Sequence, residues 1–333
     1  MARSRAELDP CPRQLHPVVI HAHLGYDGVM AIPLARRLRI PLVTTFHGSD
    51  VTLNDEALHN LGGRYHLYVQ RRESLKREGR LFIAVSEFIR GLMLARGWPE
   101  DKIVVHHIGV DTELFRPDPT VAREPIVLFA GRLIPVKGVA HLIAAMREVQ
   151  TRIPEAELVI AGQGRLQGEL ERQAKELDAR VRFLGTIPLV EMRGWMNRAR
   201  VLCIPSITAR TGHTEAFPTV AIEAQSMGLP VVGFASGGIS EAVINGQTGL
   251  LGPERDRAAL AANIEASNCK FSSGGRLGSM RARVAASKQA SEFETHAPSA
   301  TSSELRRSTV EPDETKIARP SRSRPPLPAM MSV

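Results

Sequence analysis

The sequence predicts an α/β fold made of two Rossmann-like halves joined by a linker. Short apolar runs typical of buried strands alternate with amphipathic helical stretches along most of the chain. The alternation stops at a proline-rich segment, residues 112–125, and then starts again. Repeated strand–helix units give parallel strands covered by helices. A chain of 333 residues is long enough for two such domains.

The first half is expected to span residues 17–117, including the start of the linker, after a polar leader at residues 1–16. Its expected strands are 18–23, 41–48, 81–86 and 102–110, and its expected helices are 28–38, 62–79 and 87–97. The following segment holds three prolines and mixed charges, so we interpret it as the interdomain connection.

The second half is expected to span residues 118–266. Its strands are expected at 126–131, 156–164, 180–185, 200–206 and 230–236, and its helices at 138–153, 165–177, 189–199 and 218–228, with 239–253 ending the pattern. The remaining residues, 267–333, are predicted to be a basic, mostly disordered tail. Residues 268–333 carry 11 Lys+Arg, 6 Asp+Glu and 16 Ser+Thr, a composition with little to bury.

The charge of the chain is concentrated in that tail. The whole sequence has a net charge of +8, but residues 1–267 carry 32 positive and 29 negative side chains. A folded basic groove for nucleic acid is therefore not predicted, and a nucleic-acid binder has only the tail to support it. Three widely spaced cysteines predict neither a disulfide framework nor a zinc site. No apolar run is long enough for a spanning helix, and no secretory signal is visible.

Two basic side chains follow the first strand of the second half. Gly131 ends this strand, and Arg132 and Lys137 lie on the loop before the next helix. Open parallel sheets bind ligands at the carboxyl ends of their strands, and two cations beside a helix N-terminus suit a diphosphate. The alternative is two solvated surface charges.

Two glycine-containing loops are further candidates. Gly162 and Gly164 follow a strand and allow close backbone approach, but the third glycine of a dinucleotide motif is missing. An ordinary turn is the alternative there, and the missing spacing argues against an NAD-dependent Rossmann enzyme. In residues 236–243, two glycines precede a predicted helix start, with Ser240 and Glu241 near its first turn. Backbone amides there could bind an anion, or the segment could simply be a capped helix.

The segment 211–230 predicts a ligand-facing helix N-terminus. Pro218 fits the first helical position and Gly228 the left-handed position that ends the helix. The free amides of Thr219 and Val220 would then face the carboxyl edge of the sheet, at the positive end of the helix dipole. Pro218 itself has no amide proton to donate.

Two glutamates flank the start of this helix. Glu215 precedes it and Glu223 lies inside it; if helical throughout, eight residues span about 12 Å and rotate by about 80°. The two carboxylates could therefore contact different parts of an elongated ligand. Because carboxylates accept hydrogen bonds from vicinal hydroxyls, a sugar or a ribose is the ligand we consider. Solvated glutamates are the alternative, although Glu223 lies in the apolar context VAIEA, where a charge needs a partner.

In the first half, FHGSD (46–50) closes a strand on a glycine turn, so His47 and Asp50 are expected at the carboxyl edge facing the cleft. A histidine at a strand end is more often structural, and His47 gains interest only if the cleft is functional.

Together these motifs resemble the retaining glycosyltransferases of family 4 (group 1), which have the GT-B fold, and in particular bacterial exopolysaccharide and colanic-acid-type enzymes. The matching segments are AGRLIPVKG (130–138), AGQG (161–164), EAFPTVAIEA (215–224), GLPVVGFASGGISE (228–241) and NGQTGLL (245–251), preceded by IHAHLGYDG (20–28), FHGSD (46–50), AVSEFIR (84–90) and IGVDTELFRP (108–117). The resemblance implies two Rossmann-like domains facing a cleft.

The resemblance also implies a reaction and a site. The expected reaction moves a sugar from a nucleotide diphosphate sugar to a hydroxyl of a glycan or lipid-linked acceptor, with no cofactor, no metal and no nucleic acid. A cytoplasmic location is implied, with peripheral docking at the inner face of the membrane as an option. The expected catalytic residues are Glu215, His47, Arg132 and Lys137. The expected donor-binding residues are Gly131, Arg132, Lys137, Gly162, Gly164, Glu215, Phe217, Pro218, Thr219, Val220 and Glu223.

Individual roles follow from the same resemblance. Arg132 and Lys137 would bind the diphosphate, Glu223 the ribose, and Glu215 the donor sugar. His47 would approach the sugar or its phosphate from the first domain, and residues 182–185 would flank the nucleobase.

The sequence departs from the family pattern at several places. Full members carry further strands and a Gly-rich loop before Val18, so the first domain is expected to be incomplete. Ala216 stands where Gly is usual and would crowd the donor sugar, and His213 stands where an acidic residue is common. These departures keep a second hypothesis open, an inactive fragment that binds the nucleotide donor without transfer.

Overall fold

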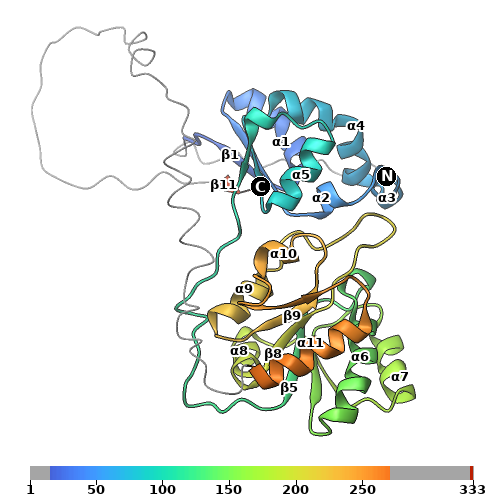
Figure 1. Cartoon of the computed structure of the whole chain (residues 1–333). Helices are drawn as coiled ribbons and strands as arrows, with labels where there is room; N and C mark the ends of the chain where they lie inside the picture. Colours follow the sequence, from blue (N-terminus) through green and yellow to red (C-terminus); the bar gives the residue numbers. More distant parts are fainter. Residues whose placement is uncertain (1–15, 271–330, 333) are drawn as a thin grey trace, which may run out of the picture.

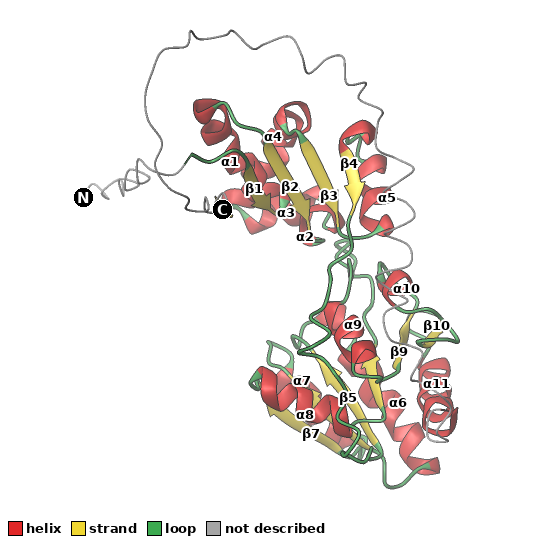
Figure 2. Cartoon of the chain, turned by 90° about the vertical axis from the view of Figure 1, so that its left-hand side faces the viewer, coloured by secondary structure: helices red, strands yellow, loops and turns green. Residues whose placement is uncertain are grey.

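The computed structural model describes residues 16–270 and 331–332 (Figure 1). It contains two parallel sheets, each flanked by helices (Figure 2), as the alternating sequence pattern predicts. The strand orders are β11-β1-β2-β3-β4 in the first sheet and β10-β9-β8-β5-β6-β7 in the second. The predictions for the polar leader and for most of the basic tail fall on residues outside the described part of the chain.

The first sheet and its helices form the N-terminal unit. Its elements are β1 (Ile20–His23), α1 (Gly25–Leu38), β2 (Leu42–Phe46), α2 (Ser49–Thr52), α3 (Asp55–Leu61), α4 (Gly63–Glu78), β3 (Leu81–Ala84), α5 (Glu87–Ala95) and β4 (Ile103–Val105), and β11 (Met331–Ser332) pairs with β1. The core of this unit contains three edge-to-face aromatic rings, Phe46, Phe82 and Trp98. These buried rings fix β2 against β3.

The second sheet and its helices form the C-terminal unit. Its elements are β5 (Ile126–Ala130), α6 (Val139–Arg152), β6 (Glu157–Ala161), α7 (Gln167–Glu176), β7 (Val181–Gly185), α8 (Leu189–Arg198), β8 (Val201–Ile204), α9 (Thr219–Ser226), β9 (Val231–Phe234), α10 (Ile239–Ala242), β10 (Gly249–Gly252) and α11 (Arg257–Lys270). Strands β8 and β9 are buried at every position, because both of their faces are covered by helices.

A partly buried arginine, Arg123, anchors the linker to the C-terminal unit. The Arg123 guanidinium donates hydrogen bonds to the carbonyls of Met196, Ala199 and Met227, at 2.6–3.0 Å. These carbonyls lie at the ends of α8 and α9, where helices leave acceptors unpaired and carry a partial negative charge. Arg123 therefore fixes where the chain enters β5.

Three sequence predictions are corrected at the level of elements. Helix α11 was not predicted, and it continues to Lys270, past the expected start of the tail. Strand β4 is shorter than predicted, because the chain leaves the sheet after Val105. Pro218 caps α9 from outside the helix, in an extended conformation, and is not its first residue. The predicted left-handed position at Gly228 is confirmed, with φ of 64°.

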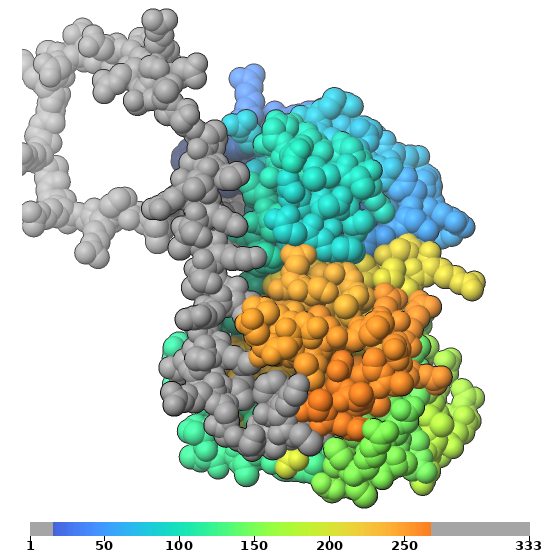
Figure 3. Space-filling view, viewed as in Figure 1, coloured from blue at the N-terminus to red at the C-terminus, as the bar shows by residue number. Residues whose placement is uncertain are grey.

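Glu241 joins the two units. It lies on α10 of the C-terminal unit, and its carboxylate accepts hydrogen bonds from the backbone amides of Glu87 and Phe88, both at 2.7 Å. These amides form the N-terminus of α5, so the carboxylate caps a helix of the other unit. It also contacts His107 Nε2 at 3.1 Å. Figure 3 shows the N-terminal unit, blue to cyan, resting on the yellow and orange part of the C-terminal unit.

A second bond reinforces this contact. Ser86 caps α5, accepting a hydrogen bond from the amide of Ile89. Its hydroxyl donates to the carbonyl of Ala216, at 2.9 Å, across the two units. The N-terminus of α5 is thus held from the C-terminal unit at two points, which sets the spacing between the sheets.

The Glu241 contact gives a first prediction. Replacing Glu241 with Ala should lower the free energy of unfolding by about 2 kcal/mol, because two helix amides lose a charged acceptor. Urea unfolding measures this loss, and small-angle scattering should show a larger radius of gyration. Burial opposes ionisation of Glu241, but the bonds from His107, Phe88 and Glu87 outweigh it and lower the pKa of the carboxyl. The contribution is therefore present at neutral pH and is lost as the pH falls through that lowered pKa.

The matched control is Glu155→Ala, because Glu155 is exposed and forms no hydrogen bond or ion pair with the described residues. Equal effects of the two substitutions would contradict the assigned role of Glu241.

Candidate functional site

A pocket of about 160 Å³ lies where loops from the two units meet. Its walls come from the loops after β1 and β2 on one side, and from the loops after β5 and β8 on the other. The carboxyl ends of both sheets therefore face one space, which is where open parallel sheets bind ligands. The residues that line it are Leu24, His47, Gly48, Ser49, Arg132, Val136, Lys137, His213, Thr214, Glu215 and Ala216. All four predicted catalytic residues lie among them.

Lys137 and Glu215 form an ion pair in this pocket. Lys137 ends a short 3-10 turn after β5, and Glu215 precedes α9, so residues far apart in the sequence meet here. Their side chains are 21% and 15% exposed, and Ser206 Oγ also donates to Glu215 at 3.3 Å. This arrangement holds a lysine ammonium and a carboxylate side by side, ready to bind an anion and a hydroxyl respectively.

Arg132 and His213 also line the pocket from the C-terminal unit. Burial lowers the pKa of His213, and the nearby positive charge of Arg132 lowers it further, although Glu215 acts in the opposite direction. His213 is therefore neutral at pH 7, and the cationic groups of the pocket are Arg132 and Lys137. An arginine and a lysine in one pocket suit a diphosphate.

Asp50 fixes the loops that carry His47. Its carboxylate is fully buried and accepts hydrogen bonds from the backbone amides of Gly25 at 2.8 Å and Gly48 at 3.0 Å. One side chain thus ties the loop after β1 to the loop after β2. Burial raises the pKa of Asp50 to about 6, despite the bonds from these amides.

The other predicted donor-binding residues lie around this pocket and not in its walls. Thr219 and Val220 begin α9, and Glu223 lies half-buried in the same helix, where its carboxylate has no hydrogen-bond or ion-pair partner among the described residues. Burial raises the pKa of Glu223. Phe217 is buried and its ring lies 5.0 Å from that of His107, so it belongs to the contact between the units.

The glycines of the predicted loops are required by close backbone approach. A Cβ on Gly162 would lie 1.9 Å from the Gly131 carbonyl oxygen, and one on Gly164 would lie 2.3 Å from that of Leu133. The loop after β6 therefore packs directly on the loop after β5. These glycines shape the loop that carries Arg132, and direct contact of Gly131, Gly162 or Gly164 with a donor stays a prediction.

The loop 236–243, considered above as an amide cradle or a capped helix, packs against the backbone of Glu215 and Ala216. A Cβ on Gly238 would lie 1.8 Å from the carbonyl oxygen of Ala216, and the Gly238 amide donates to the carbonyl of Glu215 at 2.8 Å. The two glycines let this loop fix the backbone of Glu215. Ala216 itself is 5% exposed, and its methyl faces Gly48 of the N-terminal unit. It lines the pocket from the contact between the units.

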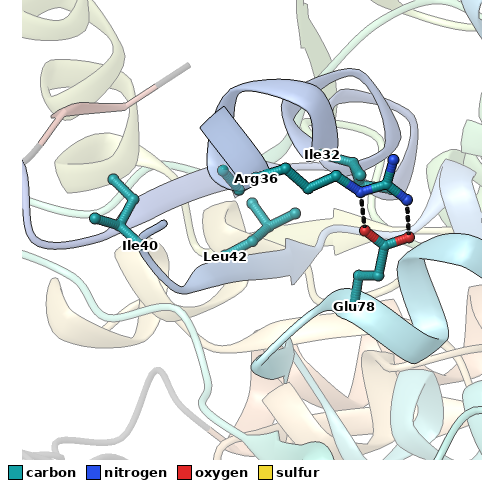
Figure 4. A pocket seen from close by; sticks show the side chains of 6 residues that line it. Ile32, Arg36, Ile40, Leu42 and Glu78 are labelled. Carbon is teal, nitrogen blue, oxygen red and sulfur yellow. Dashed lines mark hydrogen bonds and ion pairs between the residues drawn. The ribbon is translucent and has the colours of Figure 1, made fainter. Parts of the chain in front are cut away.

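A larger pocket, of about 240 Å³, lies at the opposite end of β2 (Figure 4). It is lined by Ile32, Ala35, Ile40 and Leu42, together with the Arg36–Glu78 ion pair. Its only charged groups, among the described residues, neutralise each other. Because it lies at the amino end of the strand, we do not assign it to the site.

The described residues contain no group of three or more His, Cys, Asp or Glu side chains placed to hold a metal ion. Cys203 is buried in β8, and burial raises the pKa of its thiol, so it is not a nucleophile. None of the helices in residues 16–270 has the length and apolar character needed to cross a bilayer.

Two parallel α/β units that share one cleft define the GT-B class of proteins. The model of the Glycosyltransferase Family 4 domain matches residues 2–114, and the model described as Glycosyl transferases group 1 matches residues 111–267. The chain belongs to this family of glycosyltransferases.

Two curated relatives are similar to this chain in sequence, and a solved structure is similar to it in fold. The amylovoran biosynthesis glycosyltransferase AmsK of Erwinia amylovora is 30% identical over 72% of this chain and 58% of its own length. WcaL of Escherichia coli K12, assigned to colanic acid biosynthesis, is 31% identical over 74% of this chain and 61% of its own length. The crystal structure of Anabaena HepE with UDP and glucose matches with a TM-score of 0.60 and 24% identity, over 84% of this chain and 78% of that one. The chain spans 58% and 61% of the lengths of AmsK and WcaL, less than two thirds of either relative.

Asp50 gives a second prediction. Its native pKa of about 6 lies above the ordinary 3.8, so the folded chain holds this proton more tightly than the unfolded chain does. The free energy of unfolding should therefore fall as the pH rises from 4 to 6, by about 2 kcal/mol from this group, because each pH unit between the two pKa values is worth at most about 1.4 kcal/mol.

Urea unfolding of the wild type and of Asp50→Asn across this pH range tests the prediction. The difference between the two proteins should change with pH in that direction, because Asn cannot titrate. A difference that stays constant from pH 4 to 7 would show that Asp50 titrates normally.

Proposed function

We propose that this chain is a retaining glycosyltransferase that moves a sugar from a nucleotide diphosphate sugar to a hydroxyl of a glycan or lipid-linked acceptor, in cell-surface polysaccharide synthesis. One observation carries the proposal: Arg132, Lys137 and Glu215 of the C-terminal unit meet His47 of the N-terminal unit in a single pocket. Such a pocket offers cations for a diphosphate, a carboxylate for sugar hydroxyls and an imidazole from the opposite wall.

Arg132 and Lys137 would bind the donor diphosphate and stabilise the charge that develops when it departs. Preorganised cations act strongly in a partly buried site, because little water screens them. A diphosphate would compete with Glu215 for the Lys137 ammonium. The Glu215 carboxylate would then be free to accept hydrogen bonds from the hydroxyls of the donor sugar.

Glu223 would hold the ribose of the donor. It lies eight residues beyond Glu215 in sequence, half-buried about one turn inside α9, and its carboxylate has no partner among the described residues. A half-buried carboxylate without a partner is costly, and two ribose hydroxyls would supply the missing donors. The amides of Thr219 and Val220, at the start of the same helix, would assist at the diphosphate.

The reaction breaks the bond between the anomeric carbon and the diphosphate oxygen, and forms a bond from that carbon to the acceptor oxygen. The acceptor proton passes to the departing diphosphate. The anomeric carbon becomes oxocarbenium-like, and the acceptor attacks the face that the diphosphate leaves, so the configuration is retained. His47 would contact the sugar or its phosphate from the N-terminal unit.

The comparisons support the substrate class. AmsK and WcaL are named for the biosynthesis of amylovoran and colanic acid, and the HepE structure contains UDP and glucose. A second candidate function is binding of the nucleotide donor without transfer, since the charged donor-side residues of the pocket, Arg132, Lys137 and Glu215, all lie on the C-terminal unit.

The test is a panel of nucleotide sugars with detection of the released nucleoside diphosphate, which reports transfer and hydrolysis together. Glu215→Gln and Lys137→Ala should each lower kcat/KM for the preferred donor by about 100-fold or more, because each removes a preorganised charge at the reacting centre. Lys175→Ala, an exposed lysine on α7, is the matched control.

Turnover that survives both substitutions would overturn the site. Calorimetry separates the two candidate functions: donor binding without release of nucleoside diphosphate, under every acceptor condition, would favour the binding protein.

A further inference from the structure

Behind the pocket, His47 contacts a second histidine. His23 ends β1, beside the end of β2, and its Nδ1 lies 2.8 Å from Nε2 of His47. The two rings are stacked, with centroids 5.1 Å apart and planes 24° apart. His47 lines the pocket, whereas His23 does not. The pair therefore connects the pocket wall to a side chain outside it.

A hydrogen bond between two imidazole nitrogens couples their protons. One nitrogen must donate and the other must accept, so the tautomer of one ring dictates that of the other. The bond survives one added proton on the pair but not two, because both facing nitrogens would then carry hydrogens. Since Nε2 of His47 is engaged by His23, only Nδ1 of His47 remains for a ligand.

We propose that His23 is a positioning residue that orients the His47 ring and holds it in the tautomer with a proton on Nδ1. An anionic diphosphate or a sugar oxygen acting as acceptor needs a donor, and Nδ1–H is the donor that this pair leaves available. In this arrangement His23 Nδ1–H donates to Nε2 of His47. The inference rests on the proposed role of His47 in the transferase.

The packing around His23 supports a fixed ring orientation. The centroid of the His21 ring lies 4.5 Å from that of the His23 ring, with the two planes 33° apart, and His21 Nε2 is bonded to Thr45 Oγ1 at 2.7 Å. Strands β1 and β2 pair at this position, with His23 opposite Thr45. The stack of His23 on His47 is thus in contact with a third ring, that of His21, which is bonded to β2.

The charges around the stack favour a neutral His47. Burial lowers the pKa of His47, and His23 and His21 lower it further. The other titratable or charged groups around its ring or in the pocket wall are Asp50 on the same loop, and Arg132, Lys137, His213 and Glu215 from the C-terminal unit. A neutral ring has a choice of tautomer, and the bond to His23 makes that choice.

The experiment compares three variants of the full chain. His23→Phe keeps a ring in the stack but removes the nitrogen that faces His47. His23→Asn returns a hydrogen-bonding group close to the position of Nδ1. His21→Phe is the matched control, because His21 contacts the stack but does not bond to His47.

Two readouts are measured on ¹⁵N-labelled protein and on the transferase reaction. The ring ¹⁵N shifts, assigned with His47→Asn, should show Nδ1–H and a bare Nε2 for His47 in the wild type at pH 7.5. His23→Phe should shift them toward a mixture of tautomers and lower kcat by about 10-fold, with a smaller change in KM. It should also shift the acid limb of the kcat–pH profile, while His23→Asn restores most of kcat and His21→Phe changes neither readout.

Some results would overturn the inference. Unchanged His47 ring shifts in His23→Phe would do so, as would an equal change in His21→Phe, or a wild-type His47 protonated on Nε2. If the wild type releases no nucleoside diphosphate from any donor, the proposed function fails, but the ring shifts still decide whether His23 sets the tautomer. If His23→Phe does not fold, His23→Asn and the wild-type ring shifts carry the same decision.

Discussion

The contact between Glu241 and the N-terminus of α5 makes one site out of two sheets. Each unit supplies only one wall of the pocket, so the pocket depends on the distance between the walls. A carboxylate from the C-terminal unit satisfies two helix amides of the N-terminal unit that no residue of their own helix can pair. The hydroxyl of Ser86 adds a bond in the same place, to the residue that follows Glu215. The contacts that set the distance between the two pocket walls therefore lie directly beside the pocket.

Within each unit, buried backbone contacts fix the pocket loops. In the N-terminal unit, Asp50 ties two loops together, and one of them carries His47. In the C-terminal unit, Gly162 and Gly238 let neighbouring loops approach the backbone at distances that any side chain would prevent. The charged side chains of the pocket therefore extend from rigid loops, which favours the preorganised electrostatics that group transfer needs.

Much of the fold follows from the sequence pattern, because strands and helices differ in the period of their apolar residues. Helix α11 was missed, since its apolar residues are mostly alanine and give a weak pattern. The residues His47, Arg132, Lys137 and Glu215 could be placed at sheet edges from their position after predicted strands. The partners Glu241, Ser86 and His23 could not, because their contacts depend on how two sheets and adjacent strand ends are oriented. The surroundings of Ala216 could not be predicted for the same reason, because its methyl group faces Gly48 of the other unit.

The net charge of the whole chain does not describe the charges in the pocket. Most of the net charge of +8 belongs to residues 268–333, whereas the pocket holds two permanent cations and one carboxylate, with His213 neutral. Lys137 and Glu215 pair in a partly buried place, where an isolated charge is costly. In the proposed reaction, a diphosphate that takes Lys137 would bring more negative charge than Glu215 supplied, and the sugar attached to it would bring hydroxyls to the released carboxylate. In that proposal the ion pair provides a cation for the diphosphate and a carboxylate for the sugar, and the sugar hydroxyls replace the ammonium as hydrogen-bond donors to Glu215.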